Sequence, residues 1–438
     1  MKPVAALLSY AAASCLLGTS LSSSAAALEE IYQKALYNDA QLKVAEATLR
    51  SNQEILPQAK AALLPSINGT ADTTYYNTSV INYNNHGYSV SLVQPVFSAA
   101  KWFAFKRGQI LDKQAALSFD LAQQNLILRV VNGYLTVLNA KSNLETAQAQ
   151  ERAIKRRLDQ VNAQFEVGLI AITDVQEAKA SYDAARVSLI ESKGALDNSF
   201  EALERIIGEQ VTDIDELSED YPIQQPEPAT PEEWVDAALE NNIGLQVASF
   251  GIDASRRAAQ AAKSGHLPTL DFNATYDRDN GSSTRVGWVD GWVTSKVVGL
   301  SLSVPLFQGG AIQSQTRQAY AELDVAHHSF EDTYRDVKQS TRSLLRDIET
   351  SVLSVSARRQ SIISSQASLD ATSEGFNVGT RNVVDVLTAE QALYAAKRDY
   401  AAARFGYIAN LFALKQQIGS LSPADIKGLD EWLITQPE

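Results

Sequence analysis

The sequence is poor in the side chains that carry metal, redox or covalent chemistry. Its only cysteine is Cys15, and its four histidines show no metal-ligand spacing. His327 and His328 are adjacent in the chain, so they point apart on a helix. No phosphate-binding loop, dinucleotide-binding fingerprint or nucleophile elbow is present. We therefore expect no enzymatic activity, no metal and no cofactor.

Long apolar runs and an excess of positive charge are also missing. Beyond the N-terminal segment, no run approaches the roughly 18 apolar residues of a membrane helix. The formal net charge is -13 at pH 7, which disfavours a nucleic-acid partner. A chain of 438 residues would ordinarily suggest two or three globular domains. An internal repeat, described below, predicts one intertwined unit instead.

The N-terminal segment is typical of a secretory signal peptide, which we place at residues 1–27. Lys2 supplies positive charge, residues 4–21 are mostly apolar or small, and residues 24–27 offer small-residue cleavage sites. A lipoprotein signal is the alternative, but the residues before Cys15 lack the usual leucine. Removal of this signal would leave an exported chain without a thiol, stabilised by packing and assembly.

Two stretches of matching pattern, residues 165–176 and 376–387, each interrupt a long helical region. The matching positions are Phe165 and Phe376, Val167 and Val378, Gly168 and Gly379, and Asp174 and Asp385. The central glycine suits a residue that leaves a helix at positive φ. The aspartate falls in the first turns of the returning helix, where negative charge is favourable. Each stretch is therefore predicted to be the tight bend of a helical hairpin.

The bends belong to a repeat that divides the chain into two similar halves. Leu64-Pro65 matches Leu267-Pro268, and the Pro-x-Phe motif ending at Phe97 matches the one ending at Phe307. We place the remaining boundaries as a first repeat at 28–212, an acidic, proline-rich connector at 213–231, a second repeat at 232–420 and a C-terminal tail at 421–438.

Helical spacing dominates both halves. Residues 28–62 are predicted to form one helix, because their apolar positions recur at helical intervals until Pro65. Residues 101–165 continue the pattern without proline, which predicts a helix of roughly 90–100 Å. No globular core is that deep, so we expect long coiled coils with left-handed supercoiling.

Alternating segments at residues 66–97 and 270–304 predict two β-hairpins whose strands have about the length that crosses a tilted bilayer. Trp288 and Trp292 flank the last strand, as a membrane-interface girdle would require. A soluble hairpin packed on the helices is the alternative. Four strands cannot close a membrane barrel, so a barrel would have to be shared among several chains.

The bends, the Pro-x-Phe hairpins and the repeat together resemble the TolC family of outer-membrane efflux and type I secretion channels. The resemblance covers about residues 28–421. It implies a homotrimer with a twelve-stranded barrel in outer-membrane lipid and a long helical tunnel in the periplasm. The connector and tail would form an equatorial belt. The implied partners are a periplasmic adaptor and an inner-membrane pump of the RND or ABC type, which would supply the energy.

The resemblance also assigns roles at the tips, whose helices would open like an iris. Asp174 and Arg381 match an ion pair that holds neighbouring coils closed, and Asp385 matches an acidic ring at the entrance. Phe376 stands where a family tyrosine can donate a hydrogen bond, so one tether is expected to be missing. Thr388 stands where a second aspartate ring can lie, which predicts weaker cation selectivity.

Adaptors would dock on the bends themselves. The expected docking residues are Val167, Gly168, Leu169, Val378, Gly379 and Thr380. A solvated surface role for Asp174 and Arg381 is the alternative, because an exposed ion pair contributes only about 0–1 kcal/mol. Two other functions are a trimeric coiled-coil adhesin, which would need an exposed head, and a general porin, which would need more strands per chain.

Overall fold

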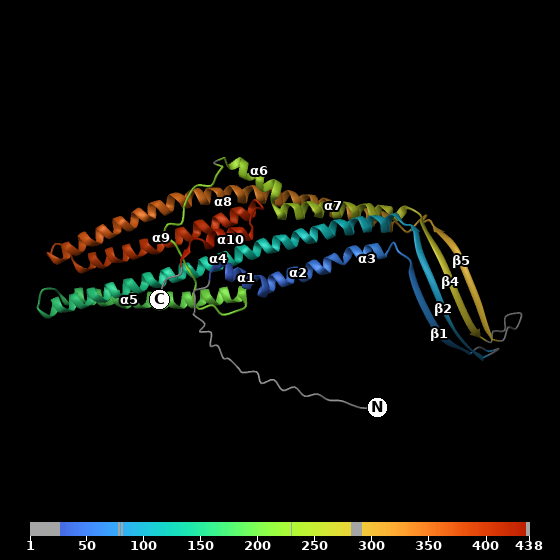
Figure 1. Ribbon diagram of the computed structural model, residues 1–438, viewed down its shortest axis with the longest axis horizontal. Helices are drawn as coiled ribbons and strands as arrows, with labels where there is room; N and C mark the ends of the chain where they lie inside the picture. Colours follow the sequence, from blue (N-terminus) through green and yellow to red (C-terminus); the bar gives the residue numbers. More distant parts are fainter. Residues whose placement is uncertain (1–26, 78, 80–81, 229, 282–290, 435–438) are drawn as a thin grey trace, which may run out of the picture.

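The computed structural model describes residues 27–77, 79, 82–228, 230–281 and 291–434. Residues 1–26, which make up nearly all of the expected signal peptide, and Trp288 lie outside these ranges. Figure 1 shows long helices over most of the molecule and a four-stranded sheet at one end. The predicted fold class, mainly helical with four strands per chain, is confirmed.

Two helical hairpins form the body of the molecule. Helix α4 (Ala99–Glu166) has 68 residues and returns as α5 (Ile172–Ile207), whereas α8 (Ala311–Asn377) has 67 residues and returns as α9 (Val383–Gln417). At about 1.5 Å per residue, each long helix extends roughly 100 Å. Both bends lie together at the end of the molecule opposite the sheet (Figure 1), and we call this end the tips. Among the described residues, no helix is both long and apolar enough to span a membrane.

The leading segment of each half is broken rather than continuous. The predicted helix at 28–62 is three helices, α1 (Leu28–Asn38), α2 (Ala40–Gln53) and α3 (Ile55–Ala61). Asp39 causes the first break, because its carboxylate accepts the Leu42 N–H at 2.6 Å and pairs with Arg129 of α4 at 2.7 Å. Asp39 is therefore the N-cap residue of α2, so a new helix begins within a stretch whose apolar spacing is continuous.

The second half repeats this break. Helix α6 (Pro231–Asn241) ends beside Asn242, whose side-chain oxygen accepts the Leu245 N–H of α7 (Ile243–Lys263) at 2.9 Å. A short 3-10 helix, η1 (Ser264–His266), follows. Helices α2 and α3 pack along α4, and α7 packs against both α4 and α8. The leading helices therefore support the long helices from the sheet end toward the middle.

The four long strands form one antiparallel sheet in the order β1-β2-β4-β5. The strands are β1 (Ser66–Asn77), β2 (Asn82–Phe97), β4 (Thr269–Gly281) and β5 (Trp292–Ser303). The two predicted hairpins join through β2 and β4, where Leu92 lies opposite Ala274. Strand β2 begins earlier than expected, since Asn82 to Gly87 pair with β1. Within the described chain, β1 and β5 each have one neighbouring strand only, so both outer edges are open.

A second, small group of elements packs beside the middle of the helices. Strand β3 (Glu216–Leu217) pairs with β6 (Leu433–Ile434), and α10 (Pro423–Asp430) packs against α1. The fully buried Tyr134 of α4 donates its hydroxyl to the Asp215 carbonyl at 2.7 Å. The largest apolar core lies at this level and draws residues from both hairpins, the connector and the tail.

Candidate functional site: the helical tips

Both bends have the same backbone geometry. Gly168 has φ of 80° and Gly379 has φ of 77°, the left-handed conformation that the sequence predicted. The N–H of Gly168 bonds to the Phe165 carbonyl, and the next N–H bonds back to Gln164, both at 2.9 Å. The second bend has the same two hydrogen bonds. The N–H of Gly379 bonds to the Phe376 carbonyl at 3.0 Å, and the N–H of Thr380 bonds to the Gly375 carbonyl at 2.8 Å. These paired bonds close each long helix as a Schellman motif.

The two aspartates lie where the returning helices begin. Asp174 accepts the Ala171 N–H at 3.4 Å, and Asp385 accepts the Asn382 N–H at the same distance. Asn382 returns the contact by accepting the Asp385 N–H at 2.8 Å. Each carboxylate therefore stabilises a helix N-terminus, as predicted, before any role between chains is considered.

Arg381 has a partner within its own protomer. Its guanidinium lies 3.7 Å from the Asp385 carboxylate, one helical turn away, and both side chains are partly exposed. In the described protomer, no ion pair joins Arg381 to Asp174. Thr388 is exposed and donates its hydroxyl to the Val384 carbonyl at 2.8 Å. A pairing of Asp174 with Arg381 would thus have to form between protomers.

Phe376 lies in a small apolar core beneath the bends, which we call the tip core. Its other buried members are Ile154, Val161, Ala178, Ala185, Val383, Val386 and Leu387. Phe376 is 9% exposed, whereas its repeat counterpart Phe165 is 41% exposed. The two halves therefore use the same residue differently, and only the second half buries its ring.

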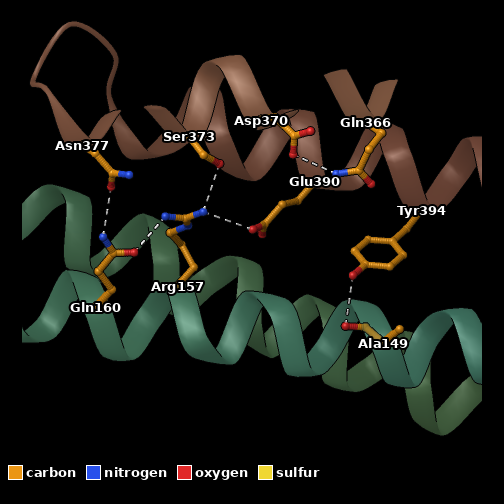
Figure 2. Close-up of polar contacts among 9 residues, drawn as sticks. All are labelled: Ala149, Arg157, Gln160, Gln366, Asp370, Ser373, Asn377, Glu390 and Tyr394. Atoms are coloured by element: carbon orange, nitrogen blue, oxygen red, sulfur yellow. Dashed lines mark hydrogen bonds and ion pairs between the residues drawn. The ribbon is translucent and has the colours of Figure 1, made fainter. Parts of the chain in front are cut away.

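A polar network that the sequence analysis did not predict joins the two hairpins beside the tip core. We call Arg157, Gln160, Ser373, Asn377 and Glu390 the tip network (Figure 2). The Arg157 guanidinium on α4 lies 3.5 Å from Glu390 on α9 and donates to the Ser373 hydroxyl on α8 at 3.2 Å. It also lies over the Phe376 ring, 5.7 Å from the centroid. One side chain of the first hairpin thus contacts both helices of the second.

Gln160 extends the network toward the bend. It accepts a hydrogen bond from Arg157 at 2.8 Å and donates to Asn377, the last residue of α8, at 3.4 Å (Figure 2). Farther from the tips, Tyr394 of α9 donates to the Ala149 carbonyl of α4 at 3.2 Å (Figure 2). Arg398 donates to the Gln150 side chain at the same distance. These polar contacts therefore join α4 to the second hairpin at several positions along its length.

Glu390 is the buried acidic residue among these polar contacts. Glu390 is only 5% exposed, and this burial raises the pKa of its carboxyl group. Attraction to the Arg157 guanidinium lowers that pKa but offsets only part of the increase. Within the described chain, its second oxygen and the Arg157 Nε have no hydrogen-bond partner. A buried pair that is only partly satisfied specifies a geometry without strongly stabilising it.

The residues of this pair did have a signature in the sequence. Arg157 follows Ile154 by three positions and precedes Val161 by four, so it lies on an apolar stripe of α4. Glu390 has a similar spacing to Val386 and Leu393 on α9. Opposite charges on two apolar stripes are compatible with a buried pair, but the pairing itself needed the fold.

The bends themselves are strongly exposed. The side chains of Val167, Leu169 and Val378 are 70%, 73% and 72% exposed. In the described residues, no three histidine, cysteine, aspartate or glutamate side chains are grouped as a metal site would need. The tips therefore combine exposed apolar side chains with a polar network that joins the two hairpins.

Known sequences match most of the chain. The profile of the family described as "Outer membrane efflux protein" matches residues 31–209 and 234–420. The outer membrane protein TolC of Escherichia coli (strain K12) is 36% identical over 440 residues, covering 95% of this chain and 88% of that protein. The alkaline protease secretion protein AprF of Pseudomonas aeruginosa is 28% identical, covering 90% of this chain and 85% of that protein.

Solved structures share the fold. The Campylobacter jejuni outer membrane channel CmeC aligns with a TM-score of 0.79 at 16% identity, covering 93% of this chain and 90% of that one. The Vibrio cholerae outer membrane protein VceC aligns with a TM-score of 0.78 at 17% identity, covering 90% and 96%. The sequence match spans both repeats and the fold agrees along the chain, so this protein belongs to the outer membrane efflux protein family.

Proposed function

We propose that this chain is one protomer of an outer-membrane exit channel that serves drug efflux and type I protein secretion. The observation that carries the proposal is the open four-stranded sheet, continuous with helices of roughly 100 Å. An unpaired strand edge in lipid leaves backbone N–H and C=O groups without hydrogen bonds, which is energetically prohibitive. The smallest membrane barrels have about eight strands. Three copies would supply twelve strands and close the barrel, with the helical hairpins forming a tunnel beneath it.

The relatives support both transport roles. The matching family profile is described as an outer membrane efflux protein, and the similarity to a protein named for alkaline protease secretion covers 90% of this chain. The chain would act as a passive duct without catalysing a reaction, so energy would come from an inner-membrane pump of the RND or ABC type. A periplasmic adaptor would connect the two. The connector and the tail would form a belt around the tunnel, since β3 pairs with β6.

The tips would be the gate and the docking surface. The exposed apolar residues Val167, Leu169 and Val378, with the adjoining Gly168, Gly379 and Thr380, would receive the adaptor. Asp174 would pair with Arg381 of a neighbouring protomer, in exchange for the weak 3.7 Å contact between Arg381 and Asp385. Asp385 would line the entrance, with Thr388 leaving it less acidic.

The tip network would set how far the second hairpin can swing. Arg157 anchors α8 and α9 to α4 through contacts of 3.2 and 3.5 Å. Phe376 would contribute packing beneath Arg157 in place of a hydrogen-bonded tether. Because the Arg157–Glu390 pair is buried but incompletely hydrogen-bonded, breaking it would demand a modest free energy, as a gate that a partner opens requires.

Single-channel conductance in planar bilayers tests this proposal. We expect Arg381→Ser and Asp174→Asn each to raise conductance, and the double variant to add little beyond either, because both remove one contact. Arg50→Ser is the matched control, since Arg50 is exposed on α2, a helix that Figure 1 shows far from the tips.

Unchanged conductance in Arg381→Ser would contradict the gate. An effect of Arg381→Ser without any effect of Asp174→Asn would assign the contact to Asp385 within one protomer. A detergent-solubilised protein that sedimented as a monomer would contradict the channel itself.

A further inference from the structure

Charge is segregated between the two faces of the membrane sheet. The register places Tyr88, Arg278 and Thr294 side by side on β2, β4 and β5. The even-numbered residues of β4, of β5 and of β2 as far as Gln94 share that face. Both strand cations, Arg278 and Lys296, lie on it, and none of the described strand carboxylates does. The four strand carboxylates on the opposite face are Asp72, Asp271, Asp277 and Asp279.

The face with the cations is the apolar one. Nearer the helices it carries Ile67, Val90, Leu92, Phe272, Val298, Leu300 and Leu302. The opposite face is mostly serine, threonine, asparagine and aspartate. In a membrane barrel the apolar face contacts lipid and the polar face lines the lumen. Arg278 and Lys296 are therefore lipid-side cations.

These two cations stand among aromatic rings toward the end of the sheet away from the helices. The Arg278 guanidinium lies 5.2 Å from the Trp292 ring centroid, and the Lys296 ammonium lies 6.0 Å from that of Tyr276. Tyr88 lies 6.1 Å from Trp292 and 6.4 Å from Tyr276. Tyrosine and tryptophan collect where the apolar core of a membrane meets its headgroups.

The depth of these residues agrees with that boundary. Leu270 and Arg278 are eight residues apart on β4, which is about 27 Å along an antiparallel strand. Strand tilt reduces this distance, so it is comparable with the apolar band of about 25 Å on a membrane barrel. The helices extend to the periplasmic side, so the cations face the outer leaflet.

A shallow apolar depression of about 320 Å³ lies beside Lys296. Lys296 lines it together with Ile67, Val90, Leu92, Tyr276 and Val298. Lys296 and Arg278 are diagonal neighbours across β4 and β5, a relation that corresponds to about 7–8 Å. No ion pair holds either cation in the described chain, and the Arg278 Nε lacks a hydrogen-bond partner there. The group combines positive charge with an apolar depression of a size suited to a hydrocarbon chain.

We propose that Arg278 and Lys296 bind a phosphate of the phosphorylated glycolipid of the outer leaflet, with an acyl chain in the adjoining depression. A phosphate accepts hydrogen bonds from a guanidinium and an ammonium at once. Basic groups at a membrane boundary recognise anionic headgroups in this way. The site lies on β1, β2, β4 and β5 of one protomer, and a trimer would carry it three times. It rests on the proposed outer-membrane channel and is independent of the gate.

Native mass spectrometry of the detergent-solubilised protein tests the site. Diphosphorylated lipid A is titrated into the wild type, Arg278→Gln, Lys296→Gln and the double variant. We expect the affinity to fall about fivefold for each cation removed, and about 25-fold in the double variant. Lys43→Gln with Arg50→Gln is the matched control, because it removes two exposed cations on α2 and should leave binding unchanged.

A comparison of lipids with and without phosphate tests whether the phosphate is the group that the site binds. Dephosphorylated lipid A should bind the wild type as weakly as intact lipid A binds the double variant, and inorganic phosphate alone should not compete. Equal binding of both forms of lipid A, or an unaltered affinity in a double variant that still assembles and conducts, would overturn the proposal. Phosphatidylglycerol that bound as tightly, with the same loss in the double variant, would overturn the assignment to the glycolipid.

Discussion

The guanidinium of Arg157 on α4 lies 3.5 Å from the Glu390 carboxylate on α9, and both side chains are largely buried. This pair joins the two hairpins of a protomer beside the tip core. Two further contacts strengthen the link, one to Ser373 at 3.2 Å and one to the Phe376 ring. Arg157 therefore has the position of an anchor for the second hairpin, and its removal should loosen the tips first.

We predict that Arg157→Ala lowers the free energy of local opening at the tips by about 3–5 kcal/mol, because it leaves a buried carboxylate without its partner. Hydrogen exchange of the tip amides measures this quantity directly. Arg358→Ala is the matched control, since its 2.6 Å pair with Asp399 joins α8 to α9 but is exposed. That control should cost only about 0–1 kcal/mol.

A double variant separates the lost contact from the stranded charge. Arg157→Met combined with Glu390→Leu removes both charges and should restore most of the stability that Arg157→Ala loses. Planar-bilayer conductance should rise in Arg157→Ala and rise less in the double variant. Equal losses from Arg157→Ala and Arg358→Ala would show that burial of the first pair has no energetic consequence.

The pH dependence of tip opening should identify Glu390. Its pKa is raised above the ordinary value of 4.5 by burial, so between 4.5 and the raised value the closed tip binds more protons than an opened, hydrated tip. Linkage then requires the free energy of opening to increase as pH falls from the raised pKa toward 4.5, and to level off below it. Opening becomes easier again as pH rises through this window.

Glu390→Gln should abolish that pH dependence, because an amide does not titrate. Tip hydrogen exchange, corrected for the intrinsic exchange rate at each pH, supplies the measurement. Asp399→Asn is the control, as it removes an exposed carboxylate on the same helix. If the slope persists in Glu390→Gln, another group carries the proton.

Much of this architecture was predictable because its signals are local. Gly168 and Gly379 marked the bends because few other residues adopt positive φ, and both have it. Alternation predicted the strands, although the early start of β2 was missed because its polar residues pair with β1. The break at Asp39 was missed because apolar spacing continues through it, and only contact with Arg129 shows the carboxylate as a cap.

The tip network was missed for a different reason. Arg157 and Ser373 are 216 positions apart, and no local pattern links them. A single arginine on an apolar stripe is more often a side chain that extends to water. Only the packing of α4 against α9 places Glu390 within reach, and that packing is a property of the fold.

Alanine at either bend should destabilise the tips through backbone strain alone. Gly168 and Gly379 have positive φ, and no atom lies within 4 Å of the place that an added Cβ would occupy, so no steric clash complicates the change. We expect Gly168→Ala and Gly379→Ala each to cost about 1–2 kcal/mol in tip opening. Adaptor binding, measured on immobilised channel, should weaken in parallel.

Gly194→Ala is the matched control, because Gly194 lies within α5 and also has nothing within 4 Å of an added Cβ. It should stabilise its helix by about 0.5–1 kcal/mol. If all three variants shifted stability in the same direction, positive φ would not be the cause of the effect at the bends.

The two halves of the repeat offer a matched pair of phenylalanines. Phe376 and Phe165 hold equivalent places before the two bends, but Phe376 is 9% exposed and packs under Arg157, whereas Phe165 is 41% exposed. Truncation of a buried phenylalanine costs about 3–5 kcal/mol, and exposed substitutions stay near about 0.5 kcal/mol. We therefore expect Phe376→Ala to open the tips and raise conductance, while Phe165→Ala has little effect on either. Comparable losses from the two variants, measured by tip hydrogen exchange, would mean that Phe165 is buried in the assembled channel.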